Sequence, residues 1–202
     1  MRPIKQISGH SEFNEVFFDD VILDDAWRLG EINQGWSVAM HALTAERFKR
    51  LNTRMPSMQS VLQLAEDCAL EGVKAIDVDS VRQKLAGNLA NKCALEHFMS
   101  RMLTQLSNGE ELGSEASILK LVSCQLNQDL SAYAMDLLEE GGTIVDPASH
   151  PLLAELYDAY LWTPGLRIAG GADEILLNII AERSLGLPGE PRSDKGKAFK
   201  DL

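Results

Sequence analysis

Apolar residues at helical spacing fill most of the chain between Gly35 and Leu187, and this restricts it to a mainly helical fold. The clearest stretch follows Ser114, where one apolar stripe continues to about Glu139 without a glycine or proline. Further segments of the same period are separated by short breaks rich in Gly, Pro or Asn-Gly. Short breaks between long helices are typical of antiparallel neighbours, so the pattern predicts an up-and-down bundle.

The expected helix ends follow from capping and breaking residues. Ser114 is placed as an N-cap, and Pro164-Gly165 is expected to end the helix before it. Gly170-Gly171 is expected to precede the last helix. The predicted helices cover about residues 36–54, 58–70, 79–106, 114–139, 151–162 and 172–185.

Two segments ahead of Gly35 have strand character. Ile4–Ile7 is short, and Phe13–Leu23 mixes aromatic, β-branched and acidic residues. Two strands alone bury too little surface to be stable, so they require further structure to pack on. The predicted class is mainly α, an up-and-down antiparallel helical bundle preceded by a short β fragment. We expect residues 1–30 to be the residual end of a β-domain, 31–188 the helical bundle domain and 189–202 a polar tail.

Composition excludes several classes of function. The formal net charge of −11 argues against nucleic acid or an anionic membrane as the main partner. No run of apolar residues is long enough to suggest a membrane span. The three cysteines are widely spaced and the histidines are scattered, so neither a disulfide framework nor a metal site is expected. A reducing compartment fits this cysteine usage, and we expect a cytoplasmic protein.

Four stretches together resemble one known family. They are residues 13–21 (FNEVFFDDV), 30–36 (GEINQGW), 43–48 (LTAERF) and 168–188, which begins IAGGADEI and ends LGLP. In order and separation they resemble the acyl-CoA dehydrogenases, from the last strands of the middle β-domain through the C-terminal helices. The resemblance covers essentially the whole chain, but only about the second half of a family member.

The resemblance implies a function for the complete protein. Family members use FAD to dehydrogenate the α,β bond of an acyl-CoA thioester, and they pass electrons to an electron-transfer flavoprotein or a similar acceptor. They assemble through the helical bundle as homodimers or tetramers, so a homo-oligomer is expected here and a hetero-oligomer is possible. The isolated chain is expected to be inactive, because most of the β-domain that covers the flavin ring is absent from it.

The resemblance also points to a catalytic base. Family members place the base carboxylate either just before the last helix, where this chain has Gly170, or on the first helix of the C-terminal domain, where Glu46-Arg47 matches. Glu46 is therefore the candidate base, and Arg47 and Thr44 are the candidate substrate-binding residues. At helical spacing Glu46 borders the apolar face of its helix, which would raise its pKa, whereas a close pairing with Arg47 would lower it.

Flavin contacts are carried over to the start of the last helix. Gly171, Ala172, Asp173 and Glu174 match the family's cofactor-binding positions, and a glycine pair allows a close backbone approach there. Ala172 stands where a threonine is usual, which removes one hydroxyl donor.

Two other segments depart from the family's diphosphate-binding pattern. Gly72 occupies the position of an arginine, and Asp136–Glu140 places acids where a glutamine- and glycine-containing segment is usual. Losing a cation and adding carboxylates both weaken the binding of an anion. An alternative reading follows, in which the chain is a non-catalytic structural subunit that assembles with a competent partner through its bundle.

Overall fold

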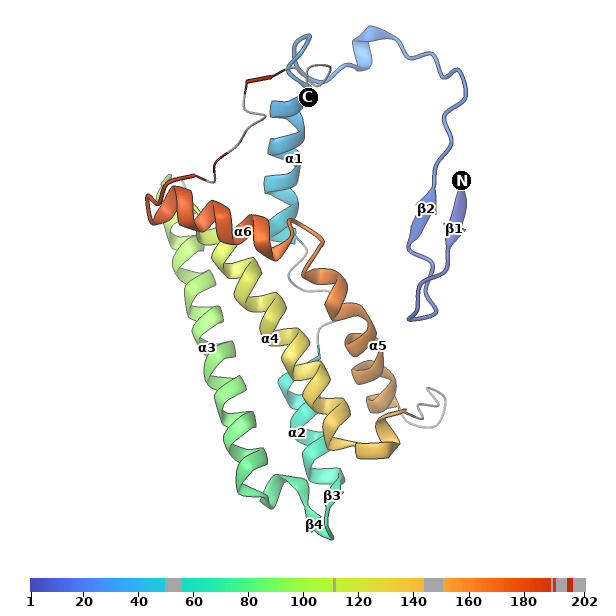
Figure 1. Ribbon diagram of the computed structural model, residues 1–202, viewed down its shortest axis with the longest axis vertical. Helices are drawn as coiled ribbons and strands as arrows, with labels where there is room; N and C mark the ends of the chain where they lie inside the picture. The colour runs from blue at the N-terminus through green and yellow to red at the C-terminus, as the bar shows by residue number, and fades with distance from the viewer. Residues whose placement is uncertain (50–55, 111, 144–150, 190, 192–195, 198–202) are drawn as a thin grey trace.

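The fold is organised around one helix, α4 (Glu115–Leu137). It packs between α3 (Asp79–Ser107) and α5 (Pro151–Leu166) and also contacts α2 (Met58–Asp67) and α6 (Asp173–Ile179) (Figure 1). No described helix is both long and apolar enough to cross a membrane.

The computed structural model describes residues 1–49, 56–110, 112–143, 151–189, 191 and 196–197, and their side chains except those of 44–49, 140 and 143.

The bundle core lies where α2, the start of α3, the second half of α4 and α5 meet. Val61 of α2, Ala134 of α4 and Leu156 of α5 are fully buried in it. Apolar burial of this kind is the main stabilising contribution in a bundle of this size. The mainly helical class predicted from the sequence is confirmed. The buried members of this cluster are Met58, Val61, Leu64, Ala65, Ala75, Val81, Leu85, Leu130, Ala134, Leu137 and Leu156.

The second helix is shorter than the sequence suggested. It was expected to reach about residue 70, but α2 ends at Asp67 and a small antiparallel hairpin follows, β3 (Ala69–Leu70) with β4 (Val73–Lys74). Both turn residues, Glu71 and Gly72, have positive φ angles of 49° and 83°. Two consecutive residues of this conformation make the tight turn that joins hairpin strands, and glycine adopts it without strain.

The predicted break at Pro164-Gly165 is wrong, because α5 continues through Pro164 to Leu166. A proline cannot donate to the carbonyl four residues earlier, but in the last turn of a helix this removes only one hydrogen bond. Packing holds the turn on either side of the proline, since Thr163 and Leu166 are both buried. The hydroxyl oxygens of Thr163 and Ser131 on α4 also lie 2.9 Å apart, within hydrogen-bond distance.

The start of α4 and the end of the last helix both differ from the prediction. Ser114 is at the N-cap position of α4, but its side chain accepts no helix N–H; its hydroxyl instead contacts that of Ser184. Ser184 lies at the end of a π-helical turn, Ile180–Ser184, which follows α6 directly. The single last helix expected over residues 172–185 is therefore a short α-helix and a wider turn.

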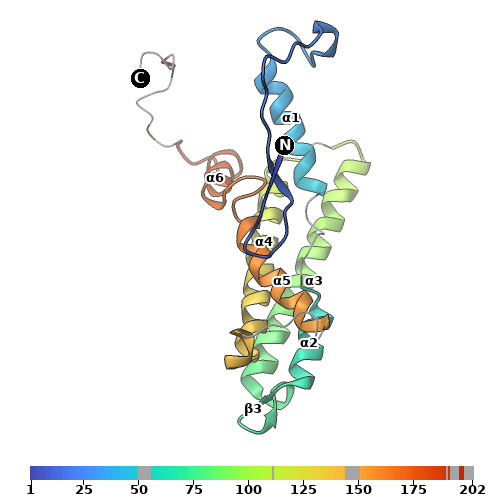
Figure 2. The ribbon, with the colours of Figure 1, turned by 90° about the vertical axis from the view of Figure 1, so that its right-hand side faces the viewer.

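The N-terminal part projects away from the bundle. Strands β1 (Arg2–Ile4) and β2 (Phe13–Glu15) pair antiparallel. The first strand lies earlier than the predicted Ile4–Ile7, because the chain turns between Gln6 and His10. The second strand is shorter than predicted, and the chain bends after it at Asp20, whose φ is +46°. Figures 1 and 2 show this hairpin and α1 (Gly35–Lys49) standing outside the helical layers. Residues 50–54 of the first predicted helix lie outside the described part.

Apolar side chains in this projecting part are open to solvent. The exposed fraction is 80% for Phe18, 80% for Trp27 and 77% for Trp36. Large apolar side chains that are individually exposed to this degree favour contact with a further apolar surface. The hairpin loop does reach the bundle, because His10 Nε2 lies 2.8 Å from Asp158 Oδ1 on α5.

Docking of α6 on α4 can be tested with two adjacent leucines. Leu176 is fully buried and Leu177 is 53% exposed. We expect Leu176→Ala to lower the free energy of unfolding by about 2–5 kcal/mol, because it leaves a cavity. The same change at Leu177 should cost about 0.5 kcal/mol. Denaturant unfolding of both variants measures this, and equal losses would contradict the docking of α6 through Leu176.

Candidate functional site

The candidate base and substrate-binding residues all lie on α1. The helix includes Thr44, Glu46 and Arg47 in its backbone, while their side chains lie outside the described part of the structure. Trp36, Met40 and Leu43 of the same helix are exposed, whereas Val38 is half-buried. The roles of Thr44, Glu46 and Arg47 therefore stay predictions.

The candidate cofactor-binding residues form the turn before α6. Gly170 and Gly171 have φ angles of 71° and 110°, a backbone conformation that favours glycine. Ala172 is the N-cap of α6 and offers no side-chain acceptor, and Glu174 is exposed. A side-chain carbon added at Gly170 would meet no atom within 4 Å, so the space beside this turn is open.

A buried lysine from α4 holds this turn in place. The Lys120 Nζ donates to the carbonyl oxygen of Gly171 at 2.7 Å, to that of Arg167 at 3.3 Å and to Asp173 Oδ1 at 3.1 Å. An ammonium group carries three donors, so all three have acceptors here. The side chains of Lys120 and Asp173 are only 6% and 7% exposed. The turn is thus bound to α4 by a cation within the bundle.

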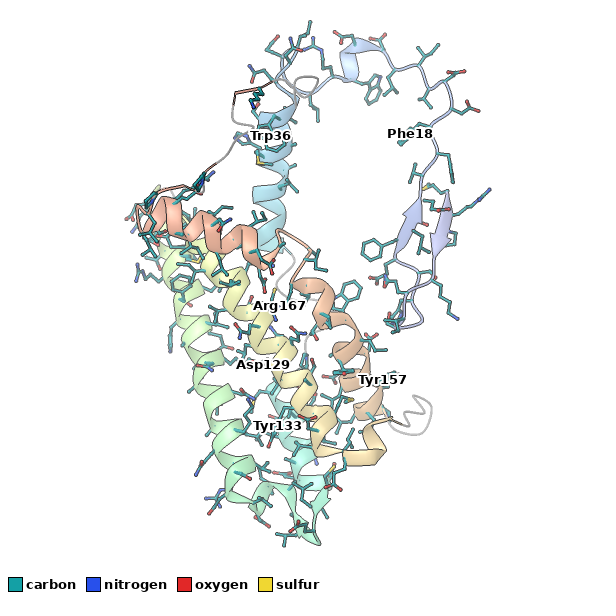
Figure 3. The ribbon with its side chains drawn as sticks, viewed as in Figure 1. Phe18, Trp36, Asp129, Tyr133, Tyr157 and Arg167 are labelled. Carbon is teal, nitrogen blue, oxygen red and sulfur yellow. The ribbon has the colours of Figure 1, made fainter. Side chains whose placement is uncertain are left out.

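Arg167 completes the ion cluster from the end of α5. Its Nε lies 2.5 Å from Asp173 Oδ2, and its Nη1 donates to Gln128 on α4 at 3.3 Å. Figure 3 shows Arg167 where the end of α5 meets α4. Burial alone would raise the pKa of Asp173, but the hydrogen bonds and charges of Arg167 and Lys120 outweigh it, so the pKa lies below its usual value. Asp173 is therefore a carboxylate with both oxygens committed to protein partners.

Sequence reasoning singled out Asp173 but missed its two partners. Lys120 interrupts the apolar run Ile118–Val122, and a lysine at such a position on a core-facing stripe is a signal that it has a buried partner. Arg167 carries no comparable signal, because an arginine after a Pro-Gly pair has the appearance of an ordinary loop residue. Among the described residues, no group of three or more His, Cys, Asp or Glu side chains is placed to hold a metal ion.

The residues that depart from the family's diphosphate-binding pattern lie in the β3–β4 turn and at the end of α4. Gly72 is the second residue of the β3–β4 turn, where its positive φ would strain an arginine. Asp136, in the last turn of α4, and Glu139, just after it, are both exposed. None of these positions supplies a cation for a phosphate.

The chain matches known proteins along most of its length. The family model described as the acyl-CoA dehydrogenase C-terminal domain matches residues 33–185. The chain belongs to the acyl-CoA dehydrogenase family. In curated relatives from Mycobacterium tuberculosis, it is 32% identical to the acyl-CoA dehydrogenase FadE34, over 93% of this chain and 25% of that protein. It is 33% identical to the acyl-CoA dehydrogenase IpdE1, over 95% of this chain and 48% of that protein.

Solved acyl-CoA dehydrogenases share the fold. A Geobacillus kaustophilus acyl-CoA dehydrogenase matches with a TM-score of 0.76 at 20% identity, over 93% of this chain and 48% of that one. The ChsE4-ChsE5 complex from M. tuberculosis matches with a TM-score of 0.74 at 22% identity, over 93% of this chain and 50% of that one. The chain thus spans a quarter to a half of the length of these relatives.

The ion cluster predicts a pH-dependent stability. At pH 7, Asp173→Asn should lower the free energy of unfolding by about 3–5 kcal/mol, because Lys120 stays buried without its counter-charge. The folded pKa of Asp173 is lowered, so its stabilising effect is fully present above the unfolded value of about 3.9 and is lost as the pH falls through the folded value. The difference between wild type and variant should therefore shrink below about pH 4.

Denaturant unfolding at pH 7, 5 and 3 measures this difference. Glu174→Gln is the matched control, since Glu174 is the adjacent acid and is exposed. A difference between wild type and Asp173→Asn that stays constant over this pH range would contradict the role of the Asp173 charge.

Proposed function

We propose that this chain is the C-terminal part of an FAD-dependent acyl-CoA dehydrogenase in which Glu46 is the catalytic base. The observation that supports it most is the family match over residues 33–185, together with a Glu-Arg pair on α1 and Gly170 at the alternative base position. The substrate would be an acyl-CoA thioester and the electron acceptor an electron-transfer flavoprotein or a similar protein. A cytoplasmic location belongs to the same proposal.

In this proposal the three candidate residues of α1 have separate roles. The carboxylate of Glu46 accepts the proton from the α-carbon of the acyl group, a hydride leaves the β-carbon, and a double bond forms between the two carbons. Bound FAD would supply the hydride acceptor. Arg47 and Thr44 would bind and orient the acyl-CoA, so that the α-proton lies within reach of Glu46.

The turn before α6 would contact the flavin. Gly171 and Ala172 allow the close approach of a cofactor edge, and the open space beside Gly170 is compatible with one. The side chain of Asp173 would hold the turn in position and would not itself contact the flavin, because its carboxylate is bound to Lys120 and Arg167. Glu174 would contribute from the exposed side of the helix.

A second candidate function is a subunit that needs a competent partner. Gly72, Asp136 and Glu139 offer no cation to a diphosphate, and the apolar residues of the N-terminal part are exposed. Two structural neighbours, the ChsE4-ChsE5 complex and the steroid acyl-CoA dehydrogenase Tcur3481-Tcur3483, contain two different chains by name. In this second reading the bundle serves assembly, as a homo-oligomer or with a different chain.

Glu46→Gln in the complete enzyme separates the two functions. Glutamine keeps the shape of the side chain but accepts no proton, so we expect flavin reduction by substrate to slow by at least about a hundredfold. Flavin content and acyl-CoA affinity should stay near wild type. Stopped-flow absorbance measures reduction, and titration of the oxidised enzyme measures affinity.

Glu31→Gln is the matched control, since Glu31 is an exposed acid that precedes α1. Adding Gly170→Glu to the Glu46→Gln variant restores a carboxylate at the other base position, and recovery of some rate would support the assignment. Near wild-type reduction by Glu46→Gln alone would instead favour the non-catalytic subunit.

The exposed apolar residues predict assembly of the 202-residue chain. We expect dimers or larger species at micromolar concentration, because many large apolar side chains of the N-terminal part are exposed and association would cover them. Replacing Phe17 and Phe18, 65% and 80% exposed, with serine should shift the equilibrium toward monomer. Light scattering across a concentration series measures this, and a wild-type chain that stays monomeric throughout would contradict it.

A further inference from the structure

A cavity lies between α3 and α4 at the N-terminal end of α2. Its volume is about 350 Å³, within the range of sites for small organic molecules. Its apolar wall comes from three helices and includes Met58, Leu95, Met99, Leu119 and Leu126. None of the residues assigned to the dehydrogenase reaction lines it.

One lining residue has an unmet hydrogen-bonding group. Asn88 is 6% exposed, and its Nδ2 has no acceptor among the residues that the structure describes. A buried amide donor without a partner is costly, and native proteins seldom retain one unless a ligand, an ion or water completes it. The other polar groups nearby are already engaged, since Ser57 Oγ accepts from the Ser60 N–H and Asn127 Nδ2 donates to the Ser123 carbonyl.

A cation lies one helical turn from this donor. Lys92 lines the same cavity, four residues after Asn88 on α3, and is half-buried. Residues four apart share one face of a helix, about 6 Å apart along its axis. No described residue forms an ion pair with Lys92 within the part of the chain that the structure covers. The amide donor and the ammonium together suit an oxygen acceptor that carries negative charge.

The apolar part of the cavity continues from this polar end. Because α3 and α4 are consecutive antiparallel helices, Met99 on α3 and Leu119 on α4 lie toward the end where the two helices are joined. Asn88 and Leu130 lie at the opposite end. Glu96 also lines the cavity and is exposed; it lies about 6 Å along the helix from Lys92 and about 12 Å from Asn88. The polar and apolar ends therefore fit a molecule with one charged head and an apolar body.

The geometry points to a second ligand site on this chain, for a small amphipathic monocarboxylate. Asn88 Nδ2 and Lys92 Nζ bind its carboxylate, and Leu95, Met99 and Leu119 pack on its hydrocarbon body. The site needs no flavin and no Glu46, so ligand binding there can be tested independently of the proposed dehydrogenase function.

Direct binding of octanoate to the 202-residue chain tests the site. We expect saturable binding by isothermal titration calorimetry, and Asn88→Leu should weaken it by about tenfold or more, because a charge-assisted hydrogen bond is lost. Lys92→Met should weaken octanoate binding similarly while leaving the binding of 1-octanol, a neutral probe, unchanged. Asn91→Leu is the matched control, since Asn91 is exposed on the same helix.

Thermal unfolding without ligand gives a second readout. Asn88→Leu should raise the melting temperature, because it replaces a buried donor that lacks an acceptor with an apolar side chain of similar size. At the same concentration, octanoate should raise the melting temperature of the wild type by more than that of Asn88→Leu. Absence of saturable octanoate binding to the wild type, or equal affinity in Asn88→Leu and wild type, would overturn the proposal.

Discussion

The ion pair between Lys120 and Asp173 is the interaction on which the arrangement of the candidate site depends. Placing an ammonium group inside a bundle is unfavourable unless each of its donors is bound and its charge is balanced. Lys120 meets both conditions only if the turn at Gly170-Gly171 and the start of α6 occupy their observed positions. Other positions of α6 would leave the charge buried and uncompensated. The pair thus selects one conformation of the segment that matches the family's cofactor-binding residues.

Much of the fold could be predicted from the sequence because helix period and breaking residues act locally. The start of α3 at Asp79 coincides with the predicted one. The errors had two causes, tertiary packing in α5 and a local turn after α2. Thr163 and Leu166 are buried on either side of Pro164 and keep the last turn of α5 helical, and a tight turn at Glu71-Gly72 ends α2 early. The hydrophobic pattern shows neither the packing around Pro164 nor the short strands on either side of Gly72.

The candidate site was predictable only in part, because short motifs identify some of its residues and long-range contacts define the others. Glu46 and the Gly171–Glu174 segment were found from a resemblance between short motifs, and their functional roles stay predictions. Lys120 and Arg167 were missed because their significance comes from contacts across 53 and 6 residues with Asp173. The Asn88 cavity was missed for the same reason. Asparagine is unremarkable on a helix, and only the packing of α3 against α4 makes its amide a donor without an acceptor.

The central place of α4 has a consequence for the order of folding. Its largest contacts are with α3 and α5, its neighbours in the sequence, so most of the bundle can form with short loop closures and correspondingly fast kinetics. The regular part of α6 has only seven residues, too few to form a stable helix before it docks. It therefore gains its structure last, on a surface already built by α4 and α5. In the native state the same segment is the one expected to detach and reattach while the rest of the bundle stays folded, and each such opening has to break the ion pair between Lys120 and Asp173.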